Sequence, residues 1–405
     1  MSEIRRVYMD HSATTPVDPL VKEEMLKYFT EEYGNASQMY SLGQNAHLAI
    51  DLAREKLAKL IGAQINEIIF NSGGTEGDNT ALKGIVLHRK NQKKHMITSK
   101  IEHPAILKTC NYLESIGIKV TYLPVDEFGL VQLEDLKEAI TRETALVSIM
   151  HANNEIGTIE PIKEIAEITH DAGAIFHTDA VQSAGKIPIN VEEMGIDLLS
   201  LSSHKIYGPK GVGALYKKQN IPLEPTIHGG GHEKGFRSGT ENVSGIVGLG
   251  KAAELAEKNL PTELKRLTKM RDKIIDNLLK IENTRLNGHP TKRLPHNVNV
   301  SFKYVEGESL ILRLDARGIS ASTGSACSSK NLSASHVLLA IGLRPEIAHG
   351  SLRLTLGRWT SDEDIDYALK EIPKIVYELR EMSAFRKETE EFVMGLKDDH
   401  DNCET

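Results

Sequence analysis

One stretch decides the fold, residues 174–211, which read AIFHTDAVQSAGKIPINVEEMGIDLLSLSSHKIYGPKG. It contains two short runs rich in apolar residues, 174–177 and 197–201, and polar residues follow each run. Short apolar runs with such boundaries predict buried strands. Asp179 follows the first run and Lys205 the second. Ligands of α/β proteins bind beyond the carboxyl ends of the strands, so this stretch predicts a site as well as a fold class.

The flanking sequence repeats the alternation of strand and helix. Further strands are predicted at residues 67–70, 95–99, 119–124 and 145–150. Helical segments lie between them, at residues 82–89, 133–140 and 161–170, and the last two place apolar residues at spacings of three and four. This order predicts an α/β fold in which helices cover both faces of a mainly parallel sheet.

The pattern changes near Pro261. A charged helix, ELKRLTKMRDKIIDNLLKI at residues 263–281, is followed by a strand at 297–302, a Gly/Ser-rich loop and further helices. We therefore expect a large domain of residues 16–260. A smaller α+β domain is expected from residues 1–15 and 261–405, with a mobile cysteine-containing loop at about 320–333.

Composition excludes several classes of function. The 405 residues carry 49 basic and 56 acidic side chains, and no Lys/Arg-rich run stands out, so binding of nucleic acid or of an anionic membrane is not expected. There is no apolar run of about twenty residues and no secretory signal pattern, so a cytoplasmic location is expected. The three cysteines, Cys110, Cys327 and Cys403, form no CxxC pair, which argues against a disulfide framework or a metal site within the chain.

Two of the strand-end residues suit a pyridoxal phosphate (PLP) enzyme. Such enzymes need a lysine for a Schiff base, an acid at the pyridinium nitrogen and an anion cradle. Lys205 and Asp179 supply the first two, and the turn NSGGTEG at residues 71–77 offers a helix N-terminus for the phosphate. Gln182 suits the ring phenolate. Each has a plainer alternative: a surface lysine, a helix-start amide, or Thr75 acting as a helix N-cap.

Other side chains suit the same chemistry. His103, after the strand at 95–99, can stack on the ring and move protons, although a structural histidine is the alternative. Asn154 follows another predicted strand, and Arg353 suits bidentate capture of a carboxylate; the alternative for both is a plain surface residue. Cys327 lies among small residues in SASTGSACSS, residues 320–329. It is either a reactive thiol or a buried one, whereas Cys110 fits the buried case and Cys403 an exposed tail.

Together these motifs resemble the NifS/IscS-type cysteine desulfurases, in the class V aminotransferase group of fold-type I PLP enzymes. The resemblance rests on YMDHSATTP (8–16), SGGTEGDN, EHPA, HANNEIG, HTDAVQ, SSHKIYGPKG, RSGTEN and the cysteine loop, and it extends to Arg358. It implies a large domain with a mainly parallel seven-stranded sheet and a smaller α+β domain. It also implies conversion of L-cysteine to L-alanine, with the sulfur held as a persulfide on Cys327.

The resemblance also implies a role for each site residue. Lys205 carries the cofactor and takes the Cα proton, His103 stacks on the ring, and Asp179 and Gln182 contact the ring nitrogen and phenolate. Asn154 and Arg353 hold the substrate carboxylate, and Asn154 also counts among the cofactor contacts. The phosphate ligands are Gly74, Thr75, Ser202 and His204, with Ser203 in the same loop, and Thr240 from a neighbouring subunit.

The role of Thr240 implies a homodimer. The long cysteine loop is similar to that of the group serving iron–sulfur assembly, so the implied acceptor is a scaffold protein of the IscU/NifU type, a tRNA-modifying enzyme, or both. A cluster shared with the scaffold makes Cys327 a candidate transient metal ligand. His232-Glu233 replaces the Gln-Glu common in the family, at a position we expect to be peripheral.

Two other functions remain open from the residues alone. An aminotransferase or a selenocysteine lyase would use the same cofactor residues, but transamination does not need a thiol in a loop. A non-catalytic sulfur-relay or scaffold subunit would not need Lys205 and Asp179, which are both present.

Overall fold

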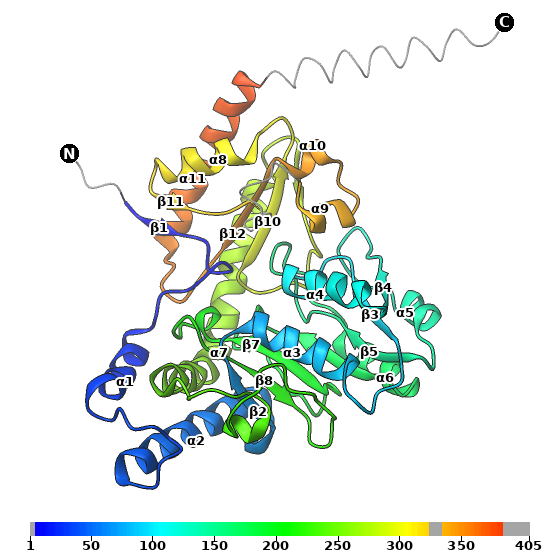
Figure 1. The fold of residues 1–405 in the computed structure, drawn as a ribbon. Helices are drawn as coiled ribbons and strands as arrows, with labels where there is room; N and C mark the ends of the chain where they lie inside the picture. Colours follow the sequence, from blue (N-terminus) through cyan, green and yellow to red (C-terminus); the bar gives the residue numbers. More distant parts are fainter. Residues whose placement is uncertain (1–4, 324–333, 384–405) are drawn as a thin grey trace, which may run out of the picture.

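The computed structural model describes residues 5–323 and 334–383. Cys327 and Cys403 therefore lie outside the described residues, as does most of the predicted cysteine loop. Figure 1 shows a larger α/β body below and a smaller body above, joined by the long helix α7 (Val243–Leu278). Among the described helices, none is both long and apolar enough to cross a bilayer.

The larger body is built on a seven-stranded sheet with the order β2-β8-β7-β6-β5-β3-β4. The strands are β2 (Ile68–Asn71), β3 (His95–Ser99), β4 (Lys119–Leu123), β5 (Thr144–Ser148), β6 (Ile175–Asp179), β7 (Leu198–Ser202) and β8 (Gly213–Lys217). All pairings are parallel except those of β8, which runs antiparallel to both β2 and β7. The predicted α/β fold with a mainly parallel seven-stranded sheet is confirmed. Strand β8 was not among the strands predicted from the sequence.

Alternation along each strand explains why both faces of the sheet are covered. Leu198 and Leu199 are neighbours on β7, yet they belong to different apolar clusters. Met96 and Ile97 on β3 divide in the same way, because successive side chains of a strand point to opposite faces. One face packs on α3 (Gly74–Val86) and α4 (Pro104–Ser115). The other packs on α2 (Ser41–Ile61), α5 (Leu133–Ala139), α6 (Ile162–Asp171) and the first half of α7.

The smaller body has its own apolar cluster. A three-stranded antiparallel sheet, in the order β12-β10-β9, packs on the second half of α7. Its strands are β9 (Thr284–Leu286), β10 (Asn297–Phe302) and β12 (Ser351–Thr355), and its helices are α8 (Gly307–Asp315), α9 (His336–Ala340), α10 (Pro345–Ala348) and α11 (Asp362–Met382). The N-terminal strand β1 (Val7–Tyr8) pairs in parallel with β11 (Ile319–Ser320). After β1 the chain crosses to α1 (Pro19–Thr30) on the larger body.

The change of pattern near Pro261 does not mark the end of an element. Helix α7 continues through Pro261. Its residues up to Ala256 pack in the cluster of the larger body, and those from Leu267 onward pack in the cluster of the smaller one. The helix is thus shared between the two apolar clusters, and the division into residues 16–260 and the remainder stays a prediction.

Candidate active site

The candidate site lies at the carboxyl edge of the seven-stranded sheet. Because β2, β3, β5, β6 and β7 are mutually parallel, the residues that follow them meet at one edge. Asp179 ends β6, and Lys205 closes the short 3-10 helix η2 (Ser203–Lys205) that follows β7. The loops after β2, β3 and β5 bring Gly74, His103 and Asn154.

Lys205 is held by the N-terminal segment. Its Nζ donates hydrogen bonds to the carbonyl oxygens of Ser12 and Ala13, the second at 2.8 Å. The amide Nε2 of Gln182 donates to the same Ser12 carbonyl at 3.0 Å. The segment between β1 and α1 therefore forms one wall of the site, a contribution that no local sequence pattern revealed.

Asp179 and His103 interact electrostatically with each other and with Lys205. Burial raises the pKa of the Asp179 carboxyl, and the neighbouring charges of His103 and Lys205 lower it. Burial lowers the pKa of His103, whereas the Asp179 carboxylate raises it. An acid in this position is ionised most readily when a cation faces it, which is the property needed opposite a protonated ring nitrogen.

His103 also has a structural role. Its Nδ1 accepts the backbone N–H of Ala105 at 3.1 Å, so His103 is the N-cap of α4. With Nδ1 accepting, the proton of the neutral ring is on Nε2. The two alternatives for this residue are thus not exclusive, because capping fixes the tautomer and orientation of the ring.

The turn after β2 forms an uncapped helix N-terminus. Helix α3 begins at Gly74, and the preceding Gly73 has φ of 147° and no side chain that caps the helix. A Cβ on Gly74 would lie 2.6 Å from Val181 Cγ2, and one on Gly73 would lie 3.6 Å from Ser202 Oγ. Free N–H groups at a helix start bind anions. Gly73, not Thr75, holds the N-cap position; Thr75 lies exposed in the first turn.

The other predicted phosphate ligands, His204, Ser203 and Thr240, have different surroundings. His204 Nδ1 lies 3.1 Å from Thr14 Oγ1. The hydroxyl of Ser203 faces Gly208, where a Cβ would approach it to 2.0 Å, so the structure does not bring it to the cradle. Thr240 is exposed. Three residues earlier, Arg237 pairs with Glu76 in the first turn of α3 at 3.0 Å.

These residues fit PLP. The uncapped start of α3 beside Ser202 suits a phosphate, and the buried acid Asp179 suits a cationic ring nitrogen. Within the described residues, Gln182 Oε1 is buried with no hydrogen-bond partner. Buried polar atoms are normally paired, so an orphaned amide oxygen at this position is consistent with a polar group that enters the site.

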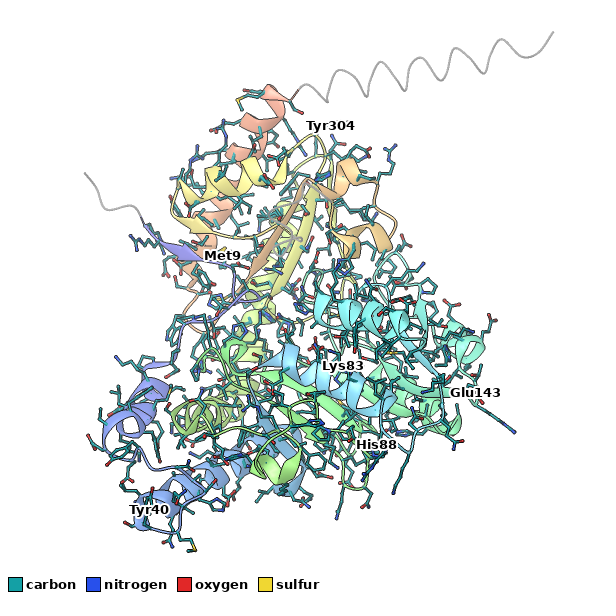
Figure 2. All side chains as sticks on the ribbon, viewed as in Figure 1. Met9, Tyr40, Lys83, His88, Glu143 and Tyr304 are labelled. Atoms are coloured by element: carbon teal, nitrogen blue, oxygen red, sulfur yellow. The ribbon has the colours of Figure 1, made fainter. Side chains whose placement is uncertain are left out.

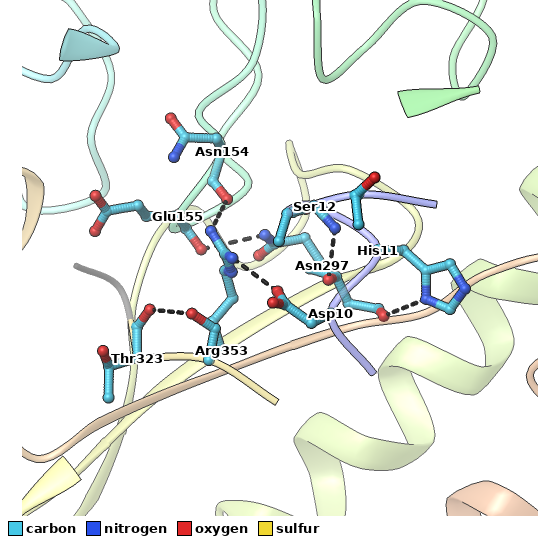
Figure 3. Close-up of polar contacts among 12 residues, drawn as sticks. Asp10, His11, Ser12, Asn154, Glu155, Asn297, Thr323 and Arg353 are labelled. Atoms are coloured by element: carbon cyan, nitrogen blue, oxygen red, sulfur yellow. Dashed lines mark hydrogen bonds and ion pairs between the residues drawn. The ribbon is translucent and has the colours of Figure 1, made fainter. Parts of the chain in front are cut away.

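Arg353 and Asn154 are in contact, as Figure 3 shows. The Nη1 group of Arg353 donates to the backbone carbonyl of Asn154 at 3.1 Å, and Nη2 donates to Asp10 Oδ1 at 2.8 Å. The side chain of Arg353 is only 3% exposed. Asp10 lies in the motif YMDHSATTP, and no local pattern predicted its contact with Arg353.

Three buried acids around the site were missed. Glu102 accepts hydrogen bonds from Ser99 Oγ and from the N–H of Met150, and burial raises its pKa to about 8. Burial raises the pKa of Glu155 to about 7, and burial also raises that of Asp78. Glu102 lies in the motif EHPA and Glu155 in HANNEIG. Nothing in the neighbouring sequence indicates that these acids are buried, so only the packed structure distinguishes them from surface acids.

Cys110 and the His232-Glu233 pair have defined surroundings in the structure. Cys110 is 0% exposed, and burial raises its pKa to about 12, which confirms the apolar interpretation. Glu233, beside the unusual His232, binds Arg54 through two hydrogen bonds of 2.8 Å and accepts the N–H of Phe70. The ring of His232 accepts the N–H of Gly239 at 3.3 Å. In the part of the chain that the structure describes, no three His, Cys, Asp or Glu side chains gather as metal ligands.

Comparisons with known proteins agree with this geometry. Residues 7–368 match the family model "Aminotransferase class-V". The cysteine desulfurase IscS of Methanosarcina thermophila is 56% identical over 94% of this chain and 95% of that protein. The IscS of Clostridium botulinum is 56% identical over 94% of this chain and 96% of its own length.

Solved structures show the same fold. A structure titled "NIFS-LIKE PROTEIN" superposes with a TM-score of 0.87 at 40% identity, covering 92% of this chain and 100% of that one. One titled "SspA in complex with cysteine" has a TM-score of 0.78 at 38% identity, covering 88% of this chain and 100% of that one. This chain therefore belongs to the class-V aminotransferase family and, within it, to the cysteine desulfurases of the NifS/IscS type.

Proposed function

We propose that the protein is a PLP-dependent cysteine desulfurase that converts L-cysteine to L-alanine and transfers the sulfur to Cys327. The observation that carries the proposal is the convergence of Lys205, Asp179 and His103 at one sheet edge, beside the buried guanidinium of Arg353. The first three suit a pyridoxal cofactor and the last a substrate carboxylate. When bound, the cofactor supplies an electron sink for the pair left when the Cα–H bond of the substrate breaks.

Each residue of the site has a separate role in the proposed reaction. Lys205 would hold the cofactor, and its amine would accept the Cα proton of the substrate. Asp179 keeps a proton on the ring nitrogen, since its buried carboxylate is stabilised by a facing cation. Gln182 would contact the phenolate, and Gly74, Thr75, Ser202 and His204 would hold the phosphate. The Nε2–H of His103 delivers a proton near the substrate sulfur.

Asn154 and Arg353 orient the substrate through its carboxylate. Both described flanks of the segment that carries Cys327 are attached to this region. Ser322 exchanges backbone hydrogen bonds with Arg353 at 2.7 and 3.3 Å, and Ser335 Oγ donates to Glu155 at 2.5 Å. These anchors support a role for Cys327 at this site, where its thiolate attacks the substrate Sγ. The S–S bond forms as the Cβ–Sγ bond breaks; the electron pair of the broken bond stays on the substrate Cβ, which takes a proton, so that L-alanine leaves and the persulfide remains on Cys327.

The persulfide on Cys327 supplies sulfur for iron–sulfur cluster assembly, with tRNA thiolation as a second outlet. The relatives named IscS support this, and the implied acceptor is a scaffold protein of the IscU/NifU type that shares a transient cluster with Cys327. The cytoplasm is the proposed location, because its reducing poise keeps a catalytic thiol available.

The active form is a homodimer in which Thr240 reaches the phosphate of the neighbouring subunit. Large apolar side chains are exposed over α1, α2 and the turn between them, and Met39 is 90% exposed. The other exposed members are Leu20, Leu26, Phe29, Tyr33, Tyr40, Leu48 and Leu52. Tyr40 lies at the outer end of α2 (Figure 2). Such a patch favours burial against a second copy, which light scattering of the purified protein tests.

Anaerobic turnover of L-cysteine with a thiol reductant tests the proposed reaction. We expect equal amounts of L-alanine and sulfide, loss of both in Lys205→Ala, and loss of sulfide transfer in Cys327→Ser. Cys110→Ser is the matched control, because this thiol is buried away from the chemistry. Full activity in Cys327→Ser, or amination of an added keto acid in place of desulfuration, would contradict the proposal.

A further inference from the structure

Arg353 has two acidic neighbours, Asp10 and Glu155. Its Nη2 group pairs with Asp10 at 2.8 Å, and its charge also acts on the buried Glu155. A buried guanidinium without a counter-charge is strongly unfavourable. Asp10 therefore provides the counter-charge of the buried Arg353 guanidinium.

The backbone positions Asp10 for this contact. The segment after β1 runs beside β12, where Asp10 forms a bridge with Thr355 and Thr355 donates its N–H to Met9 O at 2.8 Å. Residues 353 and 355 lie on the same face of a strand, so the carboxylate of Asp10 comes to lie against the guanidinium (Figure 3). The contact joins residues 343 positions apart in the chain.

Arg353 retains donors for a ligand while Asp10 stays in place. A guanidinium has five N–H donors, and among the described residues this one donates to the Asn154 carbonyl and to one Asp10 oxygen. Its Nε lies buried without a hydrogen-bond partner among the described residues. A substrate carboxylate and Asp10 can thus bind the same guanidinium together, and their like charges repel.

We propose that Asp10 is a positioning residue that sets the affinity of Arg353 for carboxylates. It orients the guanidinium and, by its own negative charge, weakens the hold on the carboxylates of L-cysteine and L-alanine. This inference rests on the proposed function, since it takes Arg353 as the ligand of the substrate carboxylate.

The test separates the charge of Asp10 from its shape. Asp10→Asn keeps an oxygen acceptor of similar size and removes the charge, whereas Asp10→Glu keeps the charge. We expect Asp10→Asn to lower both the KM for L-cysteine and the calorimetric dissociation constant of the holoenzyme for L-alanine about fivefold, through lost like-charge repulsion. Asp10→Glu should stay within about twofold of the wild type. Binding of 2-aminoethanethiol, which lacks the carboxylate, should not change.

Controls make the outcome decisive. Asp366→Asn removes the acid of an exposed pair with Lys273 on the smaller body and should leave these constants unchanged. If Asp10→Asn does not fold, Asp10→Ser carries the same expectation. Unchanged or weaker L-alanine binding in the charge-free variant, or an equal shift for 2-aminoethanethiol, overturns the inference. Arg353→Lys distinguishes failure of the Asp10 inference from failure of the proposed function. If this variant leaves the KM for L-cysteine unchanged, Arg353 does not bind the substrate carboxylate.

Discussion

At the residue scale, burial changes what a side chain can do. Glu155 and His103 are ordinary polar residues in the sequence, yet each has a fixed role in the structure. Glu155 binds Ser335, the N-cap of α9, and lies near the charge of Arg353. His103 caps α4 through Nδ1 and keeps Nε2 for the site.

Glu155 should make stability depend on pH in a specific direction. Burial raises its pKa to about 7 from an ordinary value of 4.5. Between these values the folded chain keeps a proton that the unfolded chain has lost, so this contribution to stability falls as pH rises through the window. We expect Glu155→Gln to remove that fall, measured as the melting temperature across the window relative to wild type. Glu134→Gln, at an exposed position on α5, should leave the pH dependence intact.

Substitutions of His103 should separate capping from catalysis. Asn is a good N-cap, so His103→Asn should preserve stability while kcat falls about 10²- to 10⁴-fold through the lost proton transfer. His103→Ala should lose the same activity and also about 1 kcal/mol of stability. Steady-state kinetics and urea unfolding of both variants measure the two effects. A fully active His103→Asn enzyme would remove His103 from the proposed chemistry.

At the element scale, the start of α3 can bind an anion because its first residue, Gly74, has no side chain. Gly74 packs so closely on Val181 that a Cβ would lie 2.6 Å from Cγ2. The approach keeps the N–H groups at the helix start beside Ser202, where they can receive a phosphate.

Gly74→Ala should therefore weaken retention of the cofactor. We expect lower cofactor occupancy in the purified variant, seen in its absorbance spectrum, because the helix start must shift away from Val181. Gly231→Ala is the control, since a Cβ there meets nothing within 4 Å. Occupancy equal to wild type in Gly74→Ala would mean that the phosphate lies elsewhere.

At the scale of the whole molecule, Arg358 ties the two bodies together. Its guanidinium pairs with Asp18, the N-cap of α1, and with Glu263 on α7, both at 2.6 Å. It also lies 4.4 Å from the ring centroid of Tyr207. The residue comes just after β12, so one side chain joins the N-terminal segment, the shared helix and the smaller sheet.

Arg358→Gln should destabilise the protein by about 2 kcal/mol, because it leaves two partly buried acids without their counter-charge. Lys273→Met breaks the exposed pair with Asp366 and should cost less than about 1 kcal/mol. Urea unfolding of both variants gives the comparison. Equal effects would show that Arg358 acts only as a surface charge.

The sequence by itself determined the fold class, six of the seven strands of the large sheet and the strand-end positions of Asp179, Lys205, His103 and Asn154. It could do so because apolar runs and strand-end polar residues are local signals. Only the tertiary structure decided that β8 reverses between β2 and β7, that α7 runs through Pro261, and that Asp10 meets Arg353. The burial of Glu102 and Glu155 was also decided only by the tertiary structure. Burial and charge pairing arise from residues far apart in the chain, and no local pattern records them.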